Sequence, residues 1–317
     1  MQVTNISICV LNWENYSDTR RCIAALLALP EQNDGDLNIS VVVVDNGSRD
    51  ESLIRLREFA AEISDSGARI SLIGRSENGG YAVGNNTGIH YAIENQDPAY
   101  VWVLNNDTIP QPGSLRAMVD CARSDRSVGI WGSTILNADG SIQCAGGYYY
   151  NSWLGMIRPA LPKYGLDGGQ PGLDRPLDYV SGASMLISSE VIRDIGMLSE
   201  DYFLYYEELD YAQRIRNKKT LQWCKQSRLV HFACGSTRSH GELGRVLEYH
   251  SIKSLLIYTN KFYPYKIPSV LIALLLAKPF LYVLRNEMNL FKALFAAVAN
   301  FFTGREEKKF YPESSGY

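Results

Sequence analysis

The first 110 residues alternate short apolar runs with segments whose apolar residues recur at helical spacing. Strands are expected at 5–13, 68–74 and 99–104, and over the run from residue 38 that stops at Asn46-Gly47. Helices are expected at 17–29, where Ser17 can act as the N-cap, after the Asn46-Gly47 turn, and at 80–94. Strand and helix in turn predict an α/β fold with a mostly parallel central sheet flanked by helices.

Polar side chains follow three of these strands. Asn12 ends the first strand, Asp45 ends the second, and Asn106 and Asp107 end the fourth within "VWVLNNDTIP". Because ligands bind beyond the carboxyl ends of strands in open parallel sheets, these side chains are expected to converge on one site. Turn formation alone is the competing explanation for each.

The chemistry of these side chains suits a nucleotide and a hard cation. Mg²⁺ and Mn²⁺ take oxygen ligands and bind phosphates together with one or two protein carboxylates, a role that Asp107 can fill. Asp45 can accept a hydrogen bond from a base or ribose, and Asn12 can help to hold the base. This combination fits a nucleotidyltransferase as well as a sugar transferase.

The pattern weakens after residue 110. Gly, Tyr and Pro crowd 144–176, which predicts a long irregular segment. A strand, a cap at Ser188 or Ser189 and a helix are expected over 178–196, and another helix within 200–219.

The last third is strongly apolar. The run at 267–284 is interrupted by Lys278 and Pro279, which makes it marginal for a membrane span of about 20 apolar residues. A helix over 289–302 places six apolar residues on one face, followed by basic residues. The six are Phe291, Leu294, Phe295, Val298, Phe301 and Phe302. An in-plane amphipathic anchor on the cytoplasmic leaflet is favoured over a buried bundle helix.

Composition narrows the classes of function. The chain has 317 residues, 46% of them hydrophobic, and a net charge of −3, which gives no basic field for nucleic acid. Its six cysteines contain no C-x-x-C pair, which favours a reducing compartment. The N-terminus lacks the features of a signal peptide, so a cytoplasmic protein is expected.

Six motifs, in order, carry a resemblance to a known family. They are "VLNWENYSDTRRCIAAL", "VVVVDNGSRDES", "ENGGYAVGNNTGI", "VWVLNNDT", "GASMLISSEVIRDIGMLSEDYFLYYEELDYAQRIR" and "VHFACGST". Over about residues 5–265 the chain resembles the family 2 glycosyltransferases with a GT-A fold, particularly the bacterial rhamnosyltransferase branch. The resemblance implies a GT-A domain at 1–265, with a nucleotide-binding half at about 1–110 and an acceptor half at about 111–265. A helical extension at 266–317 follows.

The resemblance also assigns roles at the donor site. The first strand end, Asn12 and Glu14 here, contacts the nucleotide. The D-N-G-S element holds the base and ribose, and the N-G-G segment closes over the nucleotide. The residues implied are Asp45, Ser48, Arg75, Asn78 and Gly79. Gly182, in "GASM", resembles the lining of the donor sugar pocket, where a small residue lets the backbone approach a ligand.

The D-x-D metal motif of the family corresponds to Asn105-Asn106-Asp107. Its first Asp is Asn here, so one carboxylate is left to hold Mg²⁺ or Mn²⁺, and metal binding is expected to depend on the donor diphosphate. Asn106 would then serve the donor. His231 matches a histidine that the family places near the metal and pyrophosphate, although a lone histidine is often structural.

Inverting transfer needs a carboxylate base on the acceptor side. The family's acidic pair aligns with Glu207-Glu208-Leu209-Asp210, and Glu208 takes the place of the usual Asp. Glu208 is therefore the expected base, with Glu207 and Asp210 as alternatives. Carboxylates at a helix N-terminus also have a purely structural explanation, so the sequence alone does not single one out.

The expected function is that of an inverting, metal-dependent glycosyltransferase. The resemblance suggests rhamnose from dTDP-rhamnose as donor, with a UDP-hexose as the alternative, and a lipid-linked or cell-surface glycan acceptor at the inner leaflet. The C-terminal helices would contact that leaflet or close a homodimer. A nucleotidyltransferase and a catalytically silent nucleotide-sugar-binding scaffold are the competing interpretations.

Overall fold

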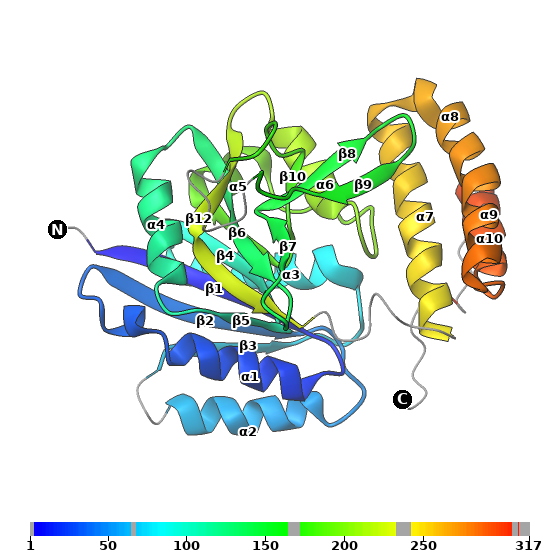
Figure 1. Ribbon diagram of the computed structural model, residues 1–317. Coiled ribbons are helices and arrows are strands. Elements are labelled where there is room, and N and C mark those ends of the chain that lie inside the picture. The colour runs from blue at the N-terminus through cyan, green and yellow to red at the C-terminus, as the bar shows by residue number, and fades with distance from the viewer. Residues whose placement is uncertain (1–2, 65–67, 164–171, 233–241, 306–309, 311–317) are drawn as a thin grey trace. The chain divides into compact units, whose positions relative to one another are not determined.

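The computed structural model describes residues 3–64, 68–163, 172–232, 242–305 and 310. Within them a nine-stranded sheet has the order β3-β2-β1-β4-β11-β6-β12-β5, and β7 pairs with β6. Strands β1 (Thr4–Asn12), β2 (Leu37–Asp45), β3 (Ile70–Gly74) and β4 (Tyr100–Asn105) are parallel, which confirms the sheet expected in the first 110 residues (Figure 1).

The remaining strands make the sheet mixed. β11 (Ser184–Ser188) runs antiparallel between β4 and β6 (Val128–Leu136), and β12 (Thr220–His231) runs parallel to β6. β5 (Thr108–Pro110) closes the edge by pairing antiparallel with β12. This pairing brings His231 level with Thr108, next to the end of β4.

Helices cover both faces of the parallel half. The core on one face joins β1 and β2 to α1 (Tyr16–Leu27), α2 (Ser52–Ser64) and α4 (Ser114–Ser124). α3 (Gly80–Gln96) covers the other face, where a Cβ on Gly88 would lie 3.2 Å from Val44. The prediction that Ser17 caps α1 is wrong. The N-cap is Asn15, whose side chain accepts a hydrogen bond from the backbone amide of Asp18.

The expectation of an irregular segment over 144–176 is wrong in its first part. β7 (Ile142–Ala145), β8 (Gly147–Asn151) and β9 (Met156–Pro159) lie there, and β8 also pairs with β10 (Tyr179–Val180). Gly146 adopts φ +80°, which lets the chain turn between β7 and β8. Residues 164–171 lie outside the described part of the chain.

Two later helices agree with expectation. Ser188 caps α5 (Ser189–Ile195) by accepting from the amide of Val191, and α6 (Glu207–Ile215) lies within 200–219.

The chain divides into two compact units. Unit 1 comprises 1–149, 159–198 and 208–232; unit 2 comprises 150–158, 199–207 and 233–317. The boundary at residue 265 between a GT-A domain and a C-terminal extension was inferred from the sequence and stays a prediction.

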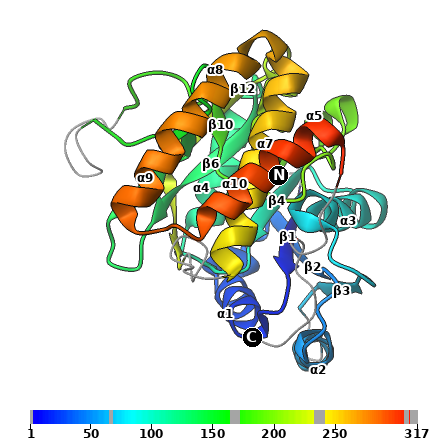
Figure 2. The ribbon, with the colours of Figure 1, turned by 90° about the vertical axis from the view of Figure 1, so that its right-hand side faces the viewer.

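Unit 2 is built mainly from helices. They are α7 (Glu242–Phe262), α8 (Ile267–Ile272), a π-helical segment (Ala273–Ala277), α9 (Lys278–Arg285) and α10 (Leu290–Thr303). In Figure 2, α10 lies alongside α7, and the amide of Asn300 on α10 donates to the hydroxyl of Tyr249 on α7. The helices expected over 267–284 and 289–302 are therefore present.

Candidate active site

Asn12 and Asp45 form the buried floor of the candidate site. The register of β1 and β2 sets the two residues side by side, and both side chains are fully buried. Nδ2 of Asn12 donates to Oδ2 of Asp45 over 2.7 Å. An amide-carboxylate pair of this kind is typical of a defined polar site, because unpaired buried polar groups are costly.

Ser48 connects the ends of β1 and β2 through hydrogen bonds. Its Oγ accepts from the backbone amide of Glu14 at 2.8 Å and from Nδ2 of Asn12 at 3.3 Å, while its own amide donates to Oδ1 of Asp45 at 3.0 Å. Glu14 has φ 49°, a conformation that non-glycine residues seldom adopt. Four of the residues expected at the nucleotide therefore belong to one hydrogen-bonded group.

The N-G-G segment packs directly on the turn that follows β2. A Cβ atom on Gly47 would lie 2.3 Å from the backbone of Glu77, so only glycine fits there. Nδ2 of Asn46 donates to Oδ1 of Asn78 at 2.9 Å, and the amide of Gly79 lies 3.4 Å from Oδ1 of Asn46.

Arg75 belongs to the same group of loops. Its amide donates to the carbonyl of Asp45 at 2.9 Å, and its Nη1 donates to Thr87 at 2.8 Å. The structure thus brings the expected donor-site residues of the first 110 positions together.

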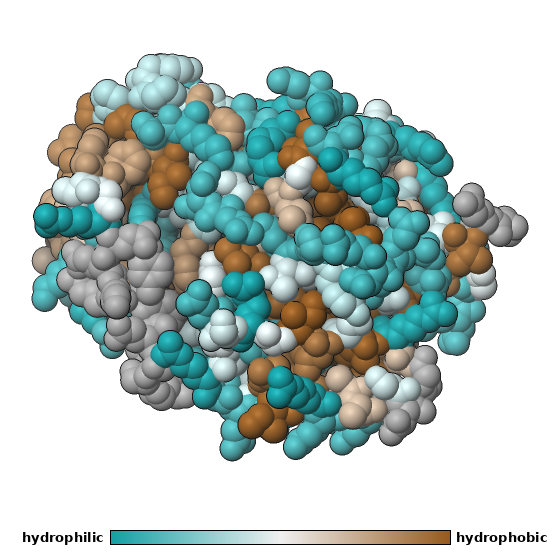
Figure 3. Space-filling model, turned by 180° about the vertical axis from the view of Figure 1, so that it is seen from behind, coloured by the Kyte–Doolittle hydropathy of each residue, from teal (hydrophilic) through white to brown (hydrophobic). Residues whose placement is uncertain are grey.

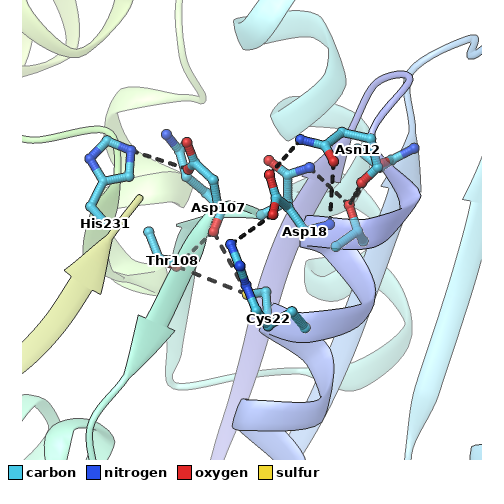
Figure 4. Close-up of polar contacts among 11 residues, drawn as sticks. Asn12, Asp18, Cys22, Asp107, Thr108 and His231 are labelled. Atoms are coloured by element: carbon cyan, nitrogen blue, oxygen red, sulfur yellow. Dashed lines mark hydrogen bonds and ion pairs between the residues drawn. The ribbon is translucent and has the colours of Figure 1, made fainter. Parts of the chain in front are cut away.

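Thr19 links the first strand end to the fourth. Its hydroxyl donates to Oδ1 of Asn12 at 2.6 Å and accepts from Nδ2 of Asn106 at 2.8 Å. Thr19 lies on α1 and is fully buried. Figure 4 shows Asn12 of the first strand end and Asp107 of the fourth on either side of α1 residues Asp18 and Cys22.

Asp107 and His231 face each other at the end of β4 (Figure 4). Nε2 of His231 lies 3.1 Å from Oδ1 of Asp107. That oxygen is buried and makes no hydrogen bond of regular geometry in the described part of the chain. Nδ1 of His231 lies 3.0 Å from Oε1 of Gln143 on β7. With Nδ1 donating to that oxygen, the neutral ring presents the unprotonated Nε2, which is the form that ligates metals.

This pair fits a divalent cation that has other ligands besides the protein. The described residues contain no group of three or more His, Cys, Asp or Glu arranged to hold a metal. Mg²⁺ and Mn²⁺ usually bind through one or two protein side chains and complete their coordination with substrate phosphates and water. Asp107 and His231 are therefore a sufficient protein contribution.

Glu208 lies against Gly182 and Tyr81. A Cβ atom on Gly182 would come 2.2 Å from Oε1 of Glu208 and 2.9 Å from the hydroxyl of Tyr81, which donates to the carbonyl of Gly182 at 2.8 Å. Burial raises the pKa of Glu208 to about 7, and hydrogen bonds from the backbone amides of Glu208 and Gly182 oppose the rise. A carboxyl group with this pKa can accept a proton near neutral pH.

The Glu208 site adjoins the Asp107 site along the backbone. The amide of Asn105 donates to the carbonyl of Ala183 at 3.2 Å. Asn105 precedes Asp107 by two residues, and Ala183 follows Gly182 directly. Glu208 on α6 thus contacts the approach to β11, and that approach is hydrogen-bonded to the end of β4 that precedes Asp107, all within unit 1.

The other two acidic residues have different surroundings. Asp210 is fully buried, and its Oδ1 accepts from Nε of Arg214 at 2.7 Å. Arg214 also donates to the carbonyls of Ile195 and Met197, which ties α6 to the segment after α5. Glu207 is 2% exposed, whereas Glu208 is only partly buried as a residue. This contrast favours Glu208 as the group that meets an acceptor.

Three residues in these contacts were not expected from the sequence. Tyr81 follows the N-G-G segment directly, so its position offered a signal. Thr19 lies within a helix whose polar residues have no distinctive spacing. Gln143 lies close to the segment read as irregular, and only the pairing of β7 with β6 brings it to His231.

Comparison with known proteins agrees with this geometry. Residues 7–196 match the model of glycosyl transferase family 2, which is more than half of the chain. The chain belongs to the family 2 glycosyltransferases.

Two curated relatives indicate the branch. The low-salt glycan biosynthesis hexosyltransferase Agl10 of Haloferax volcanii is 29% identical over 218 residues, which cover 68% of this chain and 62% of the archaeal protein. The chain therefore matches less than two thirds of that relative's length. The N-acetylglucosaminyl-diphospho-decaprenol L-rhamnosyltransferase of Mycobacterium tuberculosis is 26% identical over 219 residues, covering 63% of this chain and 68% of that protein.

Solved structures confirm the GT-A fold. The mannosyltransferase PcManGT from Pyrobaculum calidifontis, in complex with GDP-Man and Mn²⁺, aligns with a TM-score of 0.58 at 14% identity. That alignment covers 96% of this chain and 89% of PcManGT. S. aureus TarS aligns with a TM-score of 0.53 at 11% identity and covers 98% of this chain and 81% of the TarS chain.

Proposed function

We propose that the protein is an inverting glycosyltransferase that moves a sugar from a nucleotide-diphospho donor to a glycan acceptor. The observation that carries this proposal is the carboxyl of Glu208, with its pKa raised to about 7, in contact with Gly182, whose neighbour Ala183 accepts a hydrogen bond from Asn105 at the Asp107 strand end. A base and a diphosphate-binding centre on neighbouring segments are what a single displacement requires.

In the proposed reaction, an acceptor hydroxyl attacks the anomeric carbon of the donor sugar. The new glycosidic C–O bond forms as the bond between that carbon and the diphosphate oxygen breaks. Glu208 takes the hydroxyl proton, and the nucleoside diphosphate leaves with the bonding electrons. The attack comes from the face opposite the leaving group, so the anomeric configuration inverts.

The donor nucleotide is assigned to the group around Asn12, Asp45 and Ser48, with Glu14, Arg75, Asn78 and Gly79 beside it. Asp45 is buried beneath this group, so its free hydrogen-bonding capacity would be directed at the base or ribose. Asn106 is assigned to the donor and Gly182 to the wall of the sugar site.

Asp107 and His231 are assigned to a divalent cation, Mg²⁺ or Mn²⁺. The buried Oδ1 of Asp107 supports this role, because it makes no hydrogen bond of regular geometry among the described residues. When bound there, the cation would stabilise the negative charge of the diphosphate. PcManGT was solved with Mn²⁺ and its donor, which is consistent with this assignment.

The relatives guide the proposed substrates. One relative is named as a rhamnosyltransferase acting on a lipid-linked diphospho acceptor and the other as a hexosyltransferase. We therefore assign dTDP-rhamnose as the first donor to test and a UDP-hexose as the second. The acceptor class is a lipid-linked or surface glycan at the cytoplasmic face of the membrane, with residues 267–302 in contact with the inner leaflet.

A thermal-shift screen with Mn²⁺ and UDP, dTDP, GDP or CDP tests this proposal. A metal-dependent rise with one nucleotide, followed by transfer or hydrolysis of the matching sugar donor, is the expected result. Asp107→Ala should abolish both. Asp120→Ala is the matched control, since Asp120 has a 59% exposed side chain on α4.

A catalytically silent scaffold is the remaining alternative. It predicts nucleotide binding without donor turnover in the intact protein. A full donor panel that gives neither binding nor turnover would refute the enzyme proposal.

A further inference from the structure

The tip of the β8–β9 hairpin carries large apolar side chains in water. Trp153, Leu154, Met156 and Ile157 are 55%, 44%, 60% and 40% exposed. Single exposed apolar residues are common, but four within five positions of a hairpin tip are not explained by packing.

The hairpin tip is fastened to the start of α8. Nζ of Lys266 donates to Oγ of Ser152 at 2.6 Å, and Oγ of Ser269 donates to the carbonyl of Trp153 at 2.8 Å. The ring of Trp153 meets that of Tyr265 edge to face, with centroids 6.1 Å apart. Both rings are more than half exposed, so they present one aromatic surface from two distant parts of the sequence.

The apolar surface continues along the helices of unit 2. Residues Pro264–Arg285 form a helical stretch of 22 residues, whose most apolar 18-residue window has a mean hydropathy of 2.1 and is only 17% buried. Figure 3 shows apolar side chains gathered over the C-terminal helices at the upper left. The exposed residues are Ile272, Leu275, Leu276, Phe280, Leu281, Val283, Leu284 and Met288.

α10 exposes two of its phenylalanines. Ala293, Leu294, Ala297 and Asn300 are buried, while Phe295 and Phe302 are 55% and 61% exposed. A helix optimised for a water-soluble bundle would bury its phenylalanines. The exposed side chains of Phe295 and Phe302 are therefore available to contact lipid.

The contacts of Lys278 favour a helix that lies along a surface rather than one that crosses a bilayer. Nζ of Lys278 and the hydroxyl of Tyr282, both on α9, contact Oε1 of Glu248 on α7. α7 also carries Arg245 and Lys253, which are costly at the centre of a bilayer. A helix held sideways against such a partner fits the membrane interface.

Charge points to anionic lipid as the occupant. Residues 263–305 contain five basic residues and one acidic residue, although the whole chain has a net charge of −3. Arg285, Lys292 and Arg305 are exposed. A surface with exposed aromatic and basic side chains is typical of proteins that bind the headgroup region of an anionic leaflet.

We propose that the β8–β9 hairpin tip is a second membrane-contacting element, joined to the C-terminal helices in one surface that docks in the plane of an anionic bilayer. The proposal rests on the proposed function in its choice of a lipid-linked acceptor. It adds a second lipid contact, residues 153–157, which is distant in sequence from the C-terminal helices. The two contacts together would fix the orientation of unit 2 on the bilayer.

Sedimentation of the full chain with vesicles tests this proposal. The protein is expected to bind vesicles of phosphatidylcholine that contain about 30% phosphatidylglycerol as the anionic lipid. Its binding to vesicles of pure phosphatidylcholine should be weaker. The double variant Met156→Ser/Ile157→Ser should lower the affinity about tenfold or more. Ile54→Ser is the matched control, because Ile54 on α2 is 60% exposed and belongs to unit 1. This variant should bind vesicles like the wild type.

Failure of wild-type vesicle binding, or unchanged binding of the double variant, would overturn the proposal. Light scattering after size exclusion adds a further test: a wild-type dimer that the double variant abolishes would show an interface between copies instead. Nucleotide thermal shifts are measured without vesicles. Loss of those shifts with intact vesicle binding would refute the donor site while leaving the docking surface supported.

Discussion

The carboxylate of Glu208 lies so close to Gly182 that no side chain fits between them. A Cβ atom on Gly182 would stand 2.2 Å from Oε1 of Glu208. The glycine therefore lets its backbone support the carboxyl directly, through the hydrogen bond from its amide. This close approach links a small residue of the proposed sugar site to the proposed base.

Replacement of Gly182 by alanine should impair catalysis more than folding. The added methyl group would push the end of the flexible Glu208 side chain away, and misplacement of a catalytic group by about 1 Å can cost roughly 100-fold in rate. We expect kcat to fall about 10–100-fold with a small change in Tm. Gly35→Ala is the control, since nothing lies within 4 Å of a Cβ there. Equal losses of stability and activity in Gly182→Ala would contradict this view.

Replacement of Glu208 by glutamine should lower kcat by about 10²–10⁴-fold, the usual contribution of a general base. In the wild type, kcat should rise with pH and level off above about 7, because the base acts in its ionised form and its pKa is raised to about 7. Transfer rates between pH 5.5 and 8.5 check both points. Glu94→Gln, with a 62% exposed side chain, should retain the wild-type profile. A Glu208→Gln enzyme with wild-type rates would exclude this residue as the base.

Glu208 should also make the protein less stable as pH rises. Its native pKa of about 7 lies above the ordinary value of 4.5, so the native state keeps the proton over a range in which the unfolded chain has lost it. The contribution to stability is complete below about 4.5 and is lost as pH rises through 7. Relative to wild type, Glu208→Gln should gain stability from pH 4.5 to 8, by at most about 3 kcal/mol. Urea unfolding at several pH values measures this difference, and parallel curves would refute it.

Gln143 should tune metal affinity without contacting the metal. It holds Nδ1 of His231 at 3.0 Å, and removal of such a partner typically weakens metal binding about 10–100-fold. Gln143→Ala should therefore need more Mn²⁺ for the same nucleotide-dependent thermal shift, which a Mn²⁺ titration measures. Gln222→Ala, exposed on the strand that carries His231, should titrate like wild type. An unchanged midpoint in Gln143→Ala would argue against His231 as a ligand.

Thr19→Val should destabilise the protein by about 1–3 kcal/mol, because the buried side chain of Asn12 and the partly buried side chain of Asn106 would each lose a hydrogen-bond partner. The valine preserves shape, so the loss isolates the hydroxyl. Nucleotide affinity should fall as well, since the floor of the donor site loses its link to β4. Thr220→Val, at an exposed position, serves as control in urea unfolding. A neutral result for Thr19→Val would show that water replaces the hydroxyl.

The parallel half of the sheet could be predicted from sequence because each strand there is a continuous apolar run with a polar end. Val41–Val44 show this most plainly, since all four are buried. β6 could not be found in this way, because its nine residues are all buried although they include glycine, serine and threonine. Its burial comes from pairing with β11 and β12, more than 50 residues away in sequence.

Some features of the candidate site could likewise be predicted from the sequence, and others could not. The placement of Asn12, Asp45 and Asp107 at one edge of the sheet was predictable because each lies at a strand end or just beyond it. The choice among Glu207, Glu208 and Asp210 was not, because all three suit a helix N-terminus and differ only in tertiary surroundings. The ion pair of Asp210 with Arg214 follows the i,i+4 spacing of a helix, whereas the contact of Glu208 with Gly182 is long-range and is encoded by no local pattern.

The joined hairpin and helices of unit 2 would change the kinetics as well as the location of the enzyme. A protein docked flat on a leaflet meets a lipid-linked acceptor by lateral diffusion, so the relevant acceptor concentration is its mole fraction in the surface. The donor still arrives from three-dimensional solution. Dilution of the acceptor with inert lipid would then slow transfer at constant bulk concentration, whereas dilution of the vesicles with buffer that contains the same donor concentration would not slow transfer per bound enzyme.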